Sequence, residues 1–408
     1  RRPDDPALPA LTSLVTRMAG EIGDPSVAGM IRCQLFLRAL WTGNLAAARI
    51  EQAALRELAN APGASALTRL FTLLNDATLK LFQGDLPNCE RDVSTALALS
   101  AQSGVRLWDA VLIGHRISAL LARGKPDEAE ACMPALRQSL CHDRHSEISR
   151  YYGFAAWFEA HRGAHDQAVR FLGRCEQEVD LGGIPMFQAI ARLTHAETLS
   201  CIDPADPRIG LALSEAADIG RRIGNPMLQW MAGTALAGHL ACCEDAGPEG
   251  EARAQEVASE AFATGARNDY RHFICWPAVL VGSACELALR HGIETGYTQR
   301  LIRHNGIAPS ARAVALDDWP WPIRIRTLGA FSILVNGEPP PSGRKQRKVP
   351  LRLLQRLIAG GGRGVREQEI SDDLWPESDG DEANANLAIN LVRLREMLQV
   401  NCIERKGG

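Results

Sequence analysis

A turn pattern that recurs about every 40 residues constrains the fold of this chain more than any other feature. Four copies begin with glycine and end with a small residue: Gly43–Ala48, Gly84–Cys89, Gly124–Ala129 and Gly163–Ala168. Their last residues lie 41, 40 and 39 positions apart, and weaker copies follow at 206–212 and 247–252. A fixed period of this kind indicates stacked helix pairs, because one pair cannot bury its own apolar face.

Each copy predicts the end of one helix and the start of the next. The glycine ends the first helix, because it adopts left-handed backbone conformations without a steric penalty. Acidic residues that follow the turn, Asp85, Asp127 and Asp166, are predicted to cap the second helix. Ala168 and Phe171 then begin an apolar face at helical spacing. The early small residue allows a neighbouring helix to approach closely.

This pattern resembles tetratricopeptide-like arrays, although its period exceeds the 34 residues of the strict repeat. We expect a mostly α protein, with an array of about seven helix pairs over residues 1–305. Curved helical stacks present a concave binding surface, so we expect a sensor or interaction domain that binds a small molecule or a protein there. Assembly of the array into a homo-oligomer is a further expectation.

Charge and cysteine usage narrow the class of protein. The chain carries a net charge of −3, while residues 323–408 contain 14 Lys and Arg against 11 Asp and Glu. A weakly basic tail therefore follows an acidic body. The 11 cysteines form no C-x-x-C motif, as expected in a reducing compartment. The longest apolar run, residues 274–285, is too short to cross a bilayer, so we expect a cytoplasmic protein without a membrane partner.

Sequence motifs of enzymes and metal sites are missing. Gly124-Lys125 is followed by Pro126, so it is no phosphate-binding loop, and no G-x-S-x-G motif occurs. His161 and His165 stand four residues apart, but a repeat turn between them breaks the helical spacing that a shared metal needs. The segment Cys141–His145 is interpreted as a solvated loop. We predict no enzymatic activity, no metal and no cofactor in this chain.

The sequence pattern changes at residues 306–322, where Trp319-Pro320-Trp321-Pro322 does not favour a helix. Two exposed tryptophans would be unfavourable, so we interpret this segment as a packed hinge between two domains. Beyond it, alternation in Ile323–Leu328 and the apolar run Phe331–Val335 predict two strands. Asn336-Gly337 then gives a strong signal for a tight turn.

The remaining residues predict three helices behind a basic cluster at 344–348. The first begins near Pro350 and ends at the glycine run 360–362. The second is short, Glu367–Trp375, and the third runs from about Glu382 to Gln399. Strands followed by three helices and the start of a hairpin are the element order of a winged helix.

At this point the residues resemble a known family. The runs Arg326–Phe331, Asp373–Glu377 and Asn386–Leu398 are similar to the OmpR-type DNA-binding domain of SARP-like and MalT-like bacterial transcription regulators. The resemblance covers residues 323–408, and it implies a small α+β winged-helix domain with a truncated wing. Arg366 departs from the pattern, since the family usually has a serine cap there.

The resemblance also implies function. Its expected partners are double-stranded promoter DNA and RNA polymerase, and its expected recognition helix is Glu382–Gln399. A wing would follow Arg405, and an ATP-binding module would precede Arg1. The protein would then be the C-terminal part of a transcription regulator whose array senses a ligand or partner.

The predicted recognition helix supports this expectation independently. Leu387, Leu391 and Leu394 share one side of the helix, and polar and small apolar residues occupy the other. Asparagine can read adenine edges, and arginine can read guanine or contact phosphate. The candidate DNA-binding residues are Asn386, Ile389, Asn390, Val392, Arg393, Arg395, Lys345, Arg347, Lys348, Arg405 and Lys406. The alternative is a helical-repeat scaffold whose C-terminal module docks a protein instead of DNA.

Overall fold

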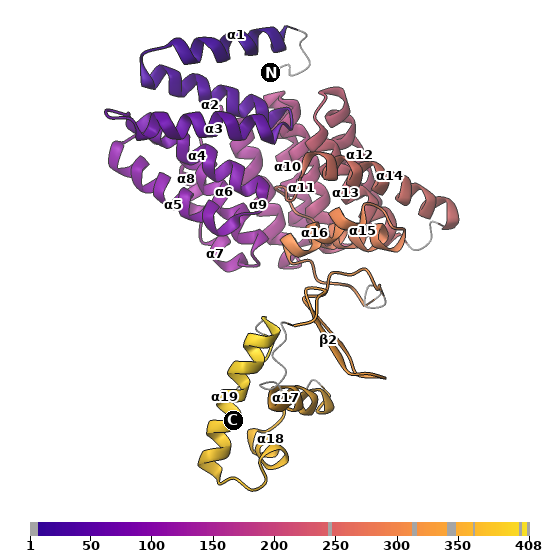
Figure 1. Cartoon of the computed structure of the whole chain (residues 1–408). Coiled ribbons are helices and arrows are strands. Elements are labelled where there is room, and N and C mark those ends of the chain that lie inside the picture. The colour runs from indigo at the N-terminus through magenta and orange to yellow at the C-terminus, as the bar shows by residue number, and fades with distance from the viewer. Residues whose placement is uncertain are drawn as a thin grey trace. The chain divides into compact units, whose positions relative to one another are not determined.

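The computed structural model describes residues 7–243, 247–311, 316–340, 348–361, 364–399 and 402–405 (Figure 1). The chain divides into two compact units, Arg1–Trp319 and Pro320–Gly408. The division falls inside the predicted hinge, residues 306–322. Trp319 is buried and Trp321 is half-buried.

The described part of the first unit contains helices and no strand. Helix α1 (Leu8–Glu21) precedes seven successive pairs, in agreement with the predicted helical repeat. The pairs are α2 (Pro25–Trp41) with α3 (Leu45–Asn60), α4 (Ala66–Gln83) with α5 (Leu86–Ser103), α6 (Asp109–Ala122) with the short α7 (Pro126–Glu130) and α8 (Met133–Gln138), α9 (His145–His161) with α10 (His165–Gly182), α11 (Pro185–Ile202) with α12 (Pro207–Arg222), α13 (Pro226–Cys242) with α14 (Gly247–Asn268), and α15 (Ala278–Arg290) with α16 (Thr295–Asn305).

The glycines of the repeat occupy the turns that the sequence predicts. Gly43, Gly84, Gly124 and Gly163 all have positive φ angles, between 69° and 76°. The residue after each glycine donates a backbone hydrogen bond to the carbonyl five positions earlier, as in Asp85 N to Lys80 O at 2.9 Å. This is the Schellman ending of a helix, and it requires the left-handed glycine.

The predicted capping role of three acidic residues is wrong. Asp85 occupies the N-cap position of α5, but its carboxylate accepts hydrogen bonds from the side chain of Asn88 and none from the helix backbone. Asp127 and Asp166 are the second residues of α7 and α10, whose N-cap residues are Lys125 and Ala164. Carboxylates in the first turn still interact favourably with the helix dipole.

The small residues at the end of each repeat copy form the tightest part of the core. Ala48, Cys89, Ala129 and Ala168 are each 0% exposed. A larger side chain at these positions would separate the helices that pack there. The period in the sequence is therefore the period of helix–helix contact.

Hydrogen bonds join the last helix pairs of the array to the first two. The Tyr270 hydroxyl donates to the Gly43 carbonyl at 2.6 Å, across 227 residues. The Asn225 side chain donates to the Trp41 carbonyl at 2.7 Å. Nε2 of His304 lies 2.6 Å from the carbonyl oxygen of Gln83. The array therefore closes on itself.

The second unit begins with an antiparallel pair of strands, β1 (Ile323–Arg326) and β2 (Ser332–Val335), with Ile323 opposite Val335. The predicted turn after β2 is confirmed, because Asn336 and Gly337 both have positive φ angles, 52° and 90°. Glu338 returns only to an isolated bridge with Val335. The described residues of this unit thus contain a two-stranded sheet.

Three helices follow: α17 (Lys348–Ala359), α18 (Glu367–Leu374) and α19 (Gly380–Leu398). All three predicted helices are confirmed, within a few residues at each end. Their apolar faces pack with β2 into one core, in which Leu353, Leu394 and Leu398 are fully buried. Arg366 is the N-cap residue of α18 and its side chain makes no cap hydrogen bond. Among the described residues, no helix has the length and hydropathy that crossing a bilayer requires.

Candidate functional site

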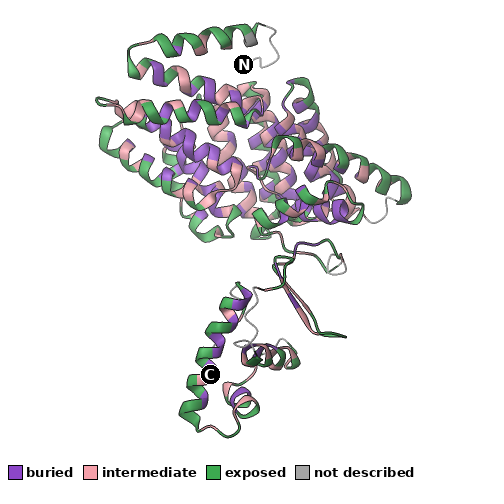
Figure 2. Ribbon diagram, in the orientation of Figure 1, coloured by how far each residue is buried: buried purple, intermediate pink, exposed green. Residues whose placement is uncertain are grey.

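Helix α19 presents one face to the core of the second unit and the other to solvent (Figure 2). It begins at Asp379, whose carboxylate accepts a hydrogen bond from the Glu382 amide at 2.8 Å. Leu387, Leu391 and Leu394 are buried, as predicted. The helix is therefore fixed in rotation about its axis, and the residues on its outer face are defined.

The outer face carries an unusual combination of side chains. Ile389 and Val392 are 49% and 52% exposed, and Arg393 is exposed beside them. Among the described residues, no carboxylate pairs with Arg393. Asn386 is half-buried at the edge of this face. Four of the predicted DNA-binding residues are thus brought together on one surface.

Two other predicted residues of α19 have structural partners. Asn390 is 6% exposed, and its Nδ2 donates to the Asn386 carbonyl at 2.8 Å. Arg395 is half-buried and donates from Nη2 to the Ile403 carbonyl at 2.9 Å. Their assignment to the DNA-contacting face is therefore corrected, because both side chains are directed to the interior or to the chain after α19.

The remaining predicted contacts are dispersed. Lys348 is exposed at the start of α17. Arg405 forms an ion pair with Glu367, with Nη2 at 2.5 Å from the carboxylate, so its charge is already neutralised. Lys345, Arg347 and Lys406 lie outside the described residues. Arg393 therefore supplies the positive charge on the outer face of α19. Asp381 and Glu382 occupy the first turn of the same helix.

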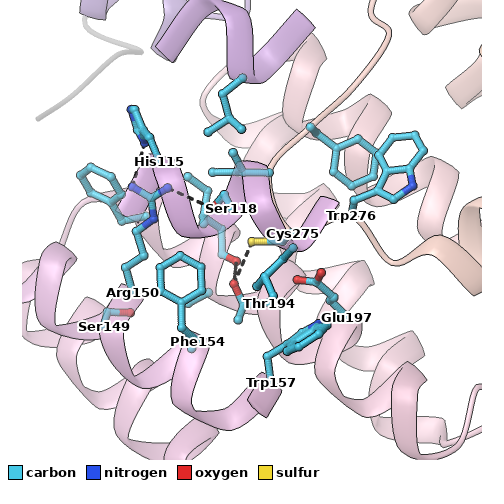
Figure 3. Close-up of a pocket in the computed structure, with 18 of the residues that line it drawn as sticks. His115, Ser118, Ser149, Arg150, Phe154, Trp157, Thr194, Glu197, Cys275 and Trp276 are labelled. Atoms are coloured by element: carbon cyan, nitrogen blue, oxygen red, sulfur yellow. Dashed lines mark hydrogen bonds between the residues drawn. The ribbon is translucent and has the colours of Figure 1, made fainter. Parts of the chain in front are cut away.

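A second candidate site lies inside the first unit. A cavity of about 510 Å³ is bounded by α2, α4, α6, α9 and α11 and by the segment before α15 (Figure 3). The sequence predicted a binding surface on the concave side of the array, without naming residues. These helices are the first members of their pairs, and Leu136 of α8 and Cys175 and Val179 of α10 add to the lining.

Arg150 of α9 is the charged centre of this cavity. Its Nη1 donates to Nδ1 of His115 at 3.0 Å, and its Nη2 donates to Ser118 at 3.1 Å. Burial lowers the pKa of Arg150 to about 10, yet the guanidinium stays charged near neutral pH. No carboxylate of the described residues lies within ion-pair distance of it.

His115 stays neutral and completes a chain of hydrogen bonds. Burial, together with the nearby charge of Arg150, lowers the pKa of His115 well below its usual range. Since Nδ1 accepts from Arg150, the ring proton is on Nε2, which faces Thr78. This chain of hydrogen bonds holds Arg150 in place.

Two further polar groups reach the cavity from α11 and from the segment before α15. Glu197 is half-buried at the cavity wall, and its partial removal from water raises the pKa of its carboxyl to about 8. No side-chain partner for Glu197 is present among the described residues. Cys275 has a positive φ of 59°, and its sulfur lies 2.9 Å from the Thr194 hydroxyl. Burial also raises the pKa of the Cys275 thiol.

Aromatic rings supply much of the remaining wall. Phe154 and Trp157 project from α9, and Phe187 and Trp276 lie on the other walls. The Arg150 guanidinium lies 5.5 Å from the centroid of the Phe154 ring. The sequence carries a signal for this wall, because five aromatic residues fall between 151 and 158 in a chain with 5% aromatics.

The histidine-rich segments do not converge. His161 stacks on Trp157 with ring centroids 3.4 Å apart, and His145 contacts Glu178. His142 is exposed. Within the described ranges, no group of three or more His, Cys, Asp or Glu side chains is placed to hold a metal ion.

Comparison with known proteins does not assign this chain to a family. No protein-family model matches this chain, and no curated protein matches it. The function is therefore inferred from the two sites described above.

Proposed function

We propose that this chain is part of a transcription regulator and that residues 320–408 bind double-stranded promoter DNA as a winged helix. The observation that carries the proposal is the outer face of α19, where Ile389, Val392 and Arg393 are exposed together. The first unit is proposed to sense a ligand in its cavity. RNA polymerase is the further partner that the resemblance implies.

The chemistry of this face suits a major groove. Exposed β-branched side chains contribute nothing to the core of this unit, but they fit the methyl groups of thymine. An unpaired arginine can donate two hydrogen bonds to guanine or contact a phosphate. A single α-helix with a free face has the width that the major groove accepts.

The acidic first turn of α19 sets the expected orientation. Asp381 and Glu382 would be repelled by phosphates, whereas Arg393 lies nearer the other end. We therefore expect base and phosphate contacts from the stretch 386–393. This orientation makes Arg393 the residue whose removal costs most affinity.

The test is selection of DNA ligands by the full chain from a random double-stranded library, followed by fluorescence anisotropy with the enriched sequence. Arg393→Ala should weaken binding by about 1–3 kcal/mol and relax the base preference at one position. Arg326→Ala, which removes an exposed arginine from β1, serves as the control and should leave affinity nearly unchanged. If Arg393 contacts phosphate, the slope of log K against log salt falls by about 0.9.

The alternative is protein docking by the same module, since exposed Ile389 and Val392 also suit a protein surface. In that case the selection would return no enriched sequence, and an acidic protein partner would compete with any non-specific DNA binding. Loss of enrichment together with equal affinities for wild type and Arg393→Ala would overturn the DNA-binding proposal.

A further inference from the structure

We propose that the cavity of the first unit binds a small amphipathic molecule with one acidic group, which pairs with Arg150 while an apolar body contacts the aromatic wall. Binding of this ligand is independent of the second unit. Only its role as the effector of a regulator rests on the proposed function.

The first step is the charge of Arg150, which has no counter-ion among the described residues. Arg150 is half-buried, and a guanidinium partly removed from water costs free energy unless a negative charge faces it. His115 and Ser118 accept hydrogen bonds from Arg150, but neither supplies a negative charge. Glu147, the nearest acidic influence on its own helix, already pairs with Arg144 at 2.8 Å. An anionic ligand group would supply what the described residues do not.

The second step is the size and lining of the cavity. Its volume of about 510 Å³ lies within the range of roughly 300–1,000 Å³ that small-molecule sites occupy. Leu74, Phe154, Trp157, Phe187 and Trp276 line it with apolar surface. Water gains few hydrogen bonds against such a surface, so an apolar ligand body is favoured there.

The third step limits the ligand to a single negative charge. Arg150 is the one lysine or arginine among the lining residues that the structure describes. A nucleotide or a diacid would leave its second charge without a cation in a buried site, which is costly. The Glu197 carboxyl also lines the cavity, and it offers a hydrogen bond to a neutral polar group of the ligand. The composition of the site therefore favours a monoanion.

Gly114 of α6 leaves the space that the Arg150 guanidinium occupies. A Cβ atom at Gly114 would lie 2.9 Å from Nη1 and 3.0 Å from Cζ of Arg150. Alanine at this position would therefore displace the guanidinium and keep its charge. Gly114→Ala is thus a second, independent variant for testing the placement of Arg150.

The experiment uses two fluorescent probes that share an apolar body and differ in charge. 1-Anilinonaphthalene-8-sulfonate carries one sulfonate, and N-phenyl-1-naphthylamine is uncharged. We expect the full chain to bind both saturably. Arg150→Met should weaken the sulfonate probe by about tenfold or more, as expected for loss of a buried charged hydrogen bond, and should change the neutral probe less than about twofold. Arg170→Met, an exposed arginine of α10, is the matched control.

The supporting result is a loss of affinity for the sulfonate probe in both Arg150→Met and Gly114→Ala, without a loss for the neutral probe. Equal weakening of both probes, or no difference from wild type, would overturn the proposal. If circular dichroism shows that the variants do not fold, the test is displacement of the neutral probe from the wild-type protein. Sodium decanoate should then compete about tenfold better than decan-1-ol. Equal competition by the two compounds would refute the charge requirement. These readouts use no DNA, so they stand apart from a failure of DNA binding.

Discussion

Oγ1 of Thr78 lies 2.8 Å from Nε2 of His115 and joins α4 to α6 beneath the cavity. The same hydroxyl donates to the Leu74 carbonyl at 2.8 Å, so it accepts the proton of His115. This contact completes the chain that holds Arg150. The cavity charge is therefore positioned by three helices, α4, α6 and α9.

Replacing Thr78 by valine tests this chain. The shape is nearly preserved, but the Nε2–H of His115 loses its acceptor in a buried position, so we expect the free energy of unfolding to fall by about 1–3 kcal/mol. Urea denaturation of the full chain measures the loss. Thr95→Val removes an exposed hydroxyl that bonds to its own helix, and it should cost less than about 0.5 kcal/mol. Equal effects of the two substitutions would contradict the role of Thr78.

The pH dependence of stability reports on Glu197. Burial raises the pKa of its carboxyl from an ordinary value of 4.5 to about 8, so between these values the folded chain holds a proton that the unfolded chain releases. Stability should therefore fall as pH rises from 4.5 to 8, by up to about 1.4 kcal/mol per pH unit from this group.

The control for this pH dependence is Glu197→Gln, which keeps the size of the side chain and cannot ionise. The difference in unfolding free energy between wild type and Glu197→Gln cancels the titration of His115 and all other groups. It should decline between pH 5 and pH 8 and level off above. Parallel curves for the two proteins would contradict the raised pKa of the Glu197 carboxyl.

Asn390 and Arg393 should respond differently to substitution. Asn390→Ala removes a buried hydrogen bond inside the second unit, so we expect a loss of about 1 kcal/mol in stability and no change in DNA affinity beyond about twofold. Arg393→Ala should lower DNA affinity and leave the melting temperature unchanged. Thermal melting and fluorescence anisotropy on the same samples separate the two effects. A joint loss of affinity in both variants would place Asn390 at the DNA after all.

Tyr270→Phe tests the closure of the array. The phenol is 1% exposed and donates to the Gly43 carbonyl, so its removal should cost about 1–1.5 kcal/mol. Backbone amides in residues 38–48 should exchange their hydrogens faster. Tyr151→Phe removes a hydroxyl without a hydrogen-bond partner among the described residues, and it should leave exchange unchanged. Unaltered exchange in both variants would mean that this contact does not hold the array closed.

Local patterns account for the parts of the fold that were predicted correctly. The repeat glycines were recognisable because a left-handed turn tolerates few other residues, and the small residues because helices meet there. The helices of the second unit follow from apolar spacing between glycine and proline signals. These features depend on residues within one or two turns of each other.

The parts that were missed depend on distant contacts. Arg150 and His115 are 35 residues apart, and neither differs locally from a surface arginine or a core histidine. Asn390 lies near the edge of the buried stripe on α19, so the angle at which the helix packs decides its burial. Asp127 and Asp166 lie in the first turn of their helices and not at the N-cap. A sequence pattern predicts the first residue of a helix only to within a residue or two.

The closed array has consequences for how such a chain can evolve. In an open solenoid each repeat touches only its neighbours, so repeats can be duplicated or deleted with little penalty. Here the turn at Gly43 must meet Tyr270 to close the array. One additional or missing helix pair would separate these two residues. The number of repeats is thereby fixed, and length variation is restricted to connections.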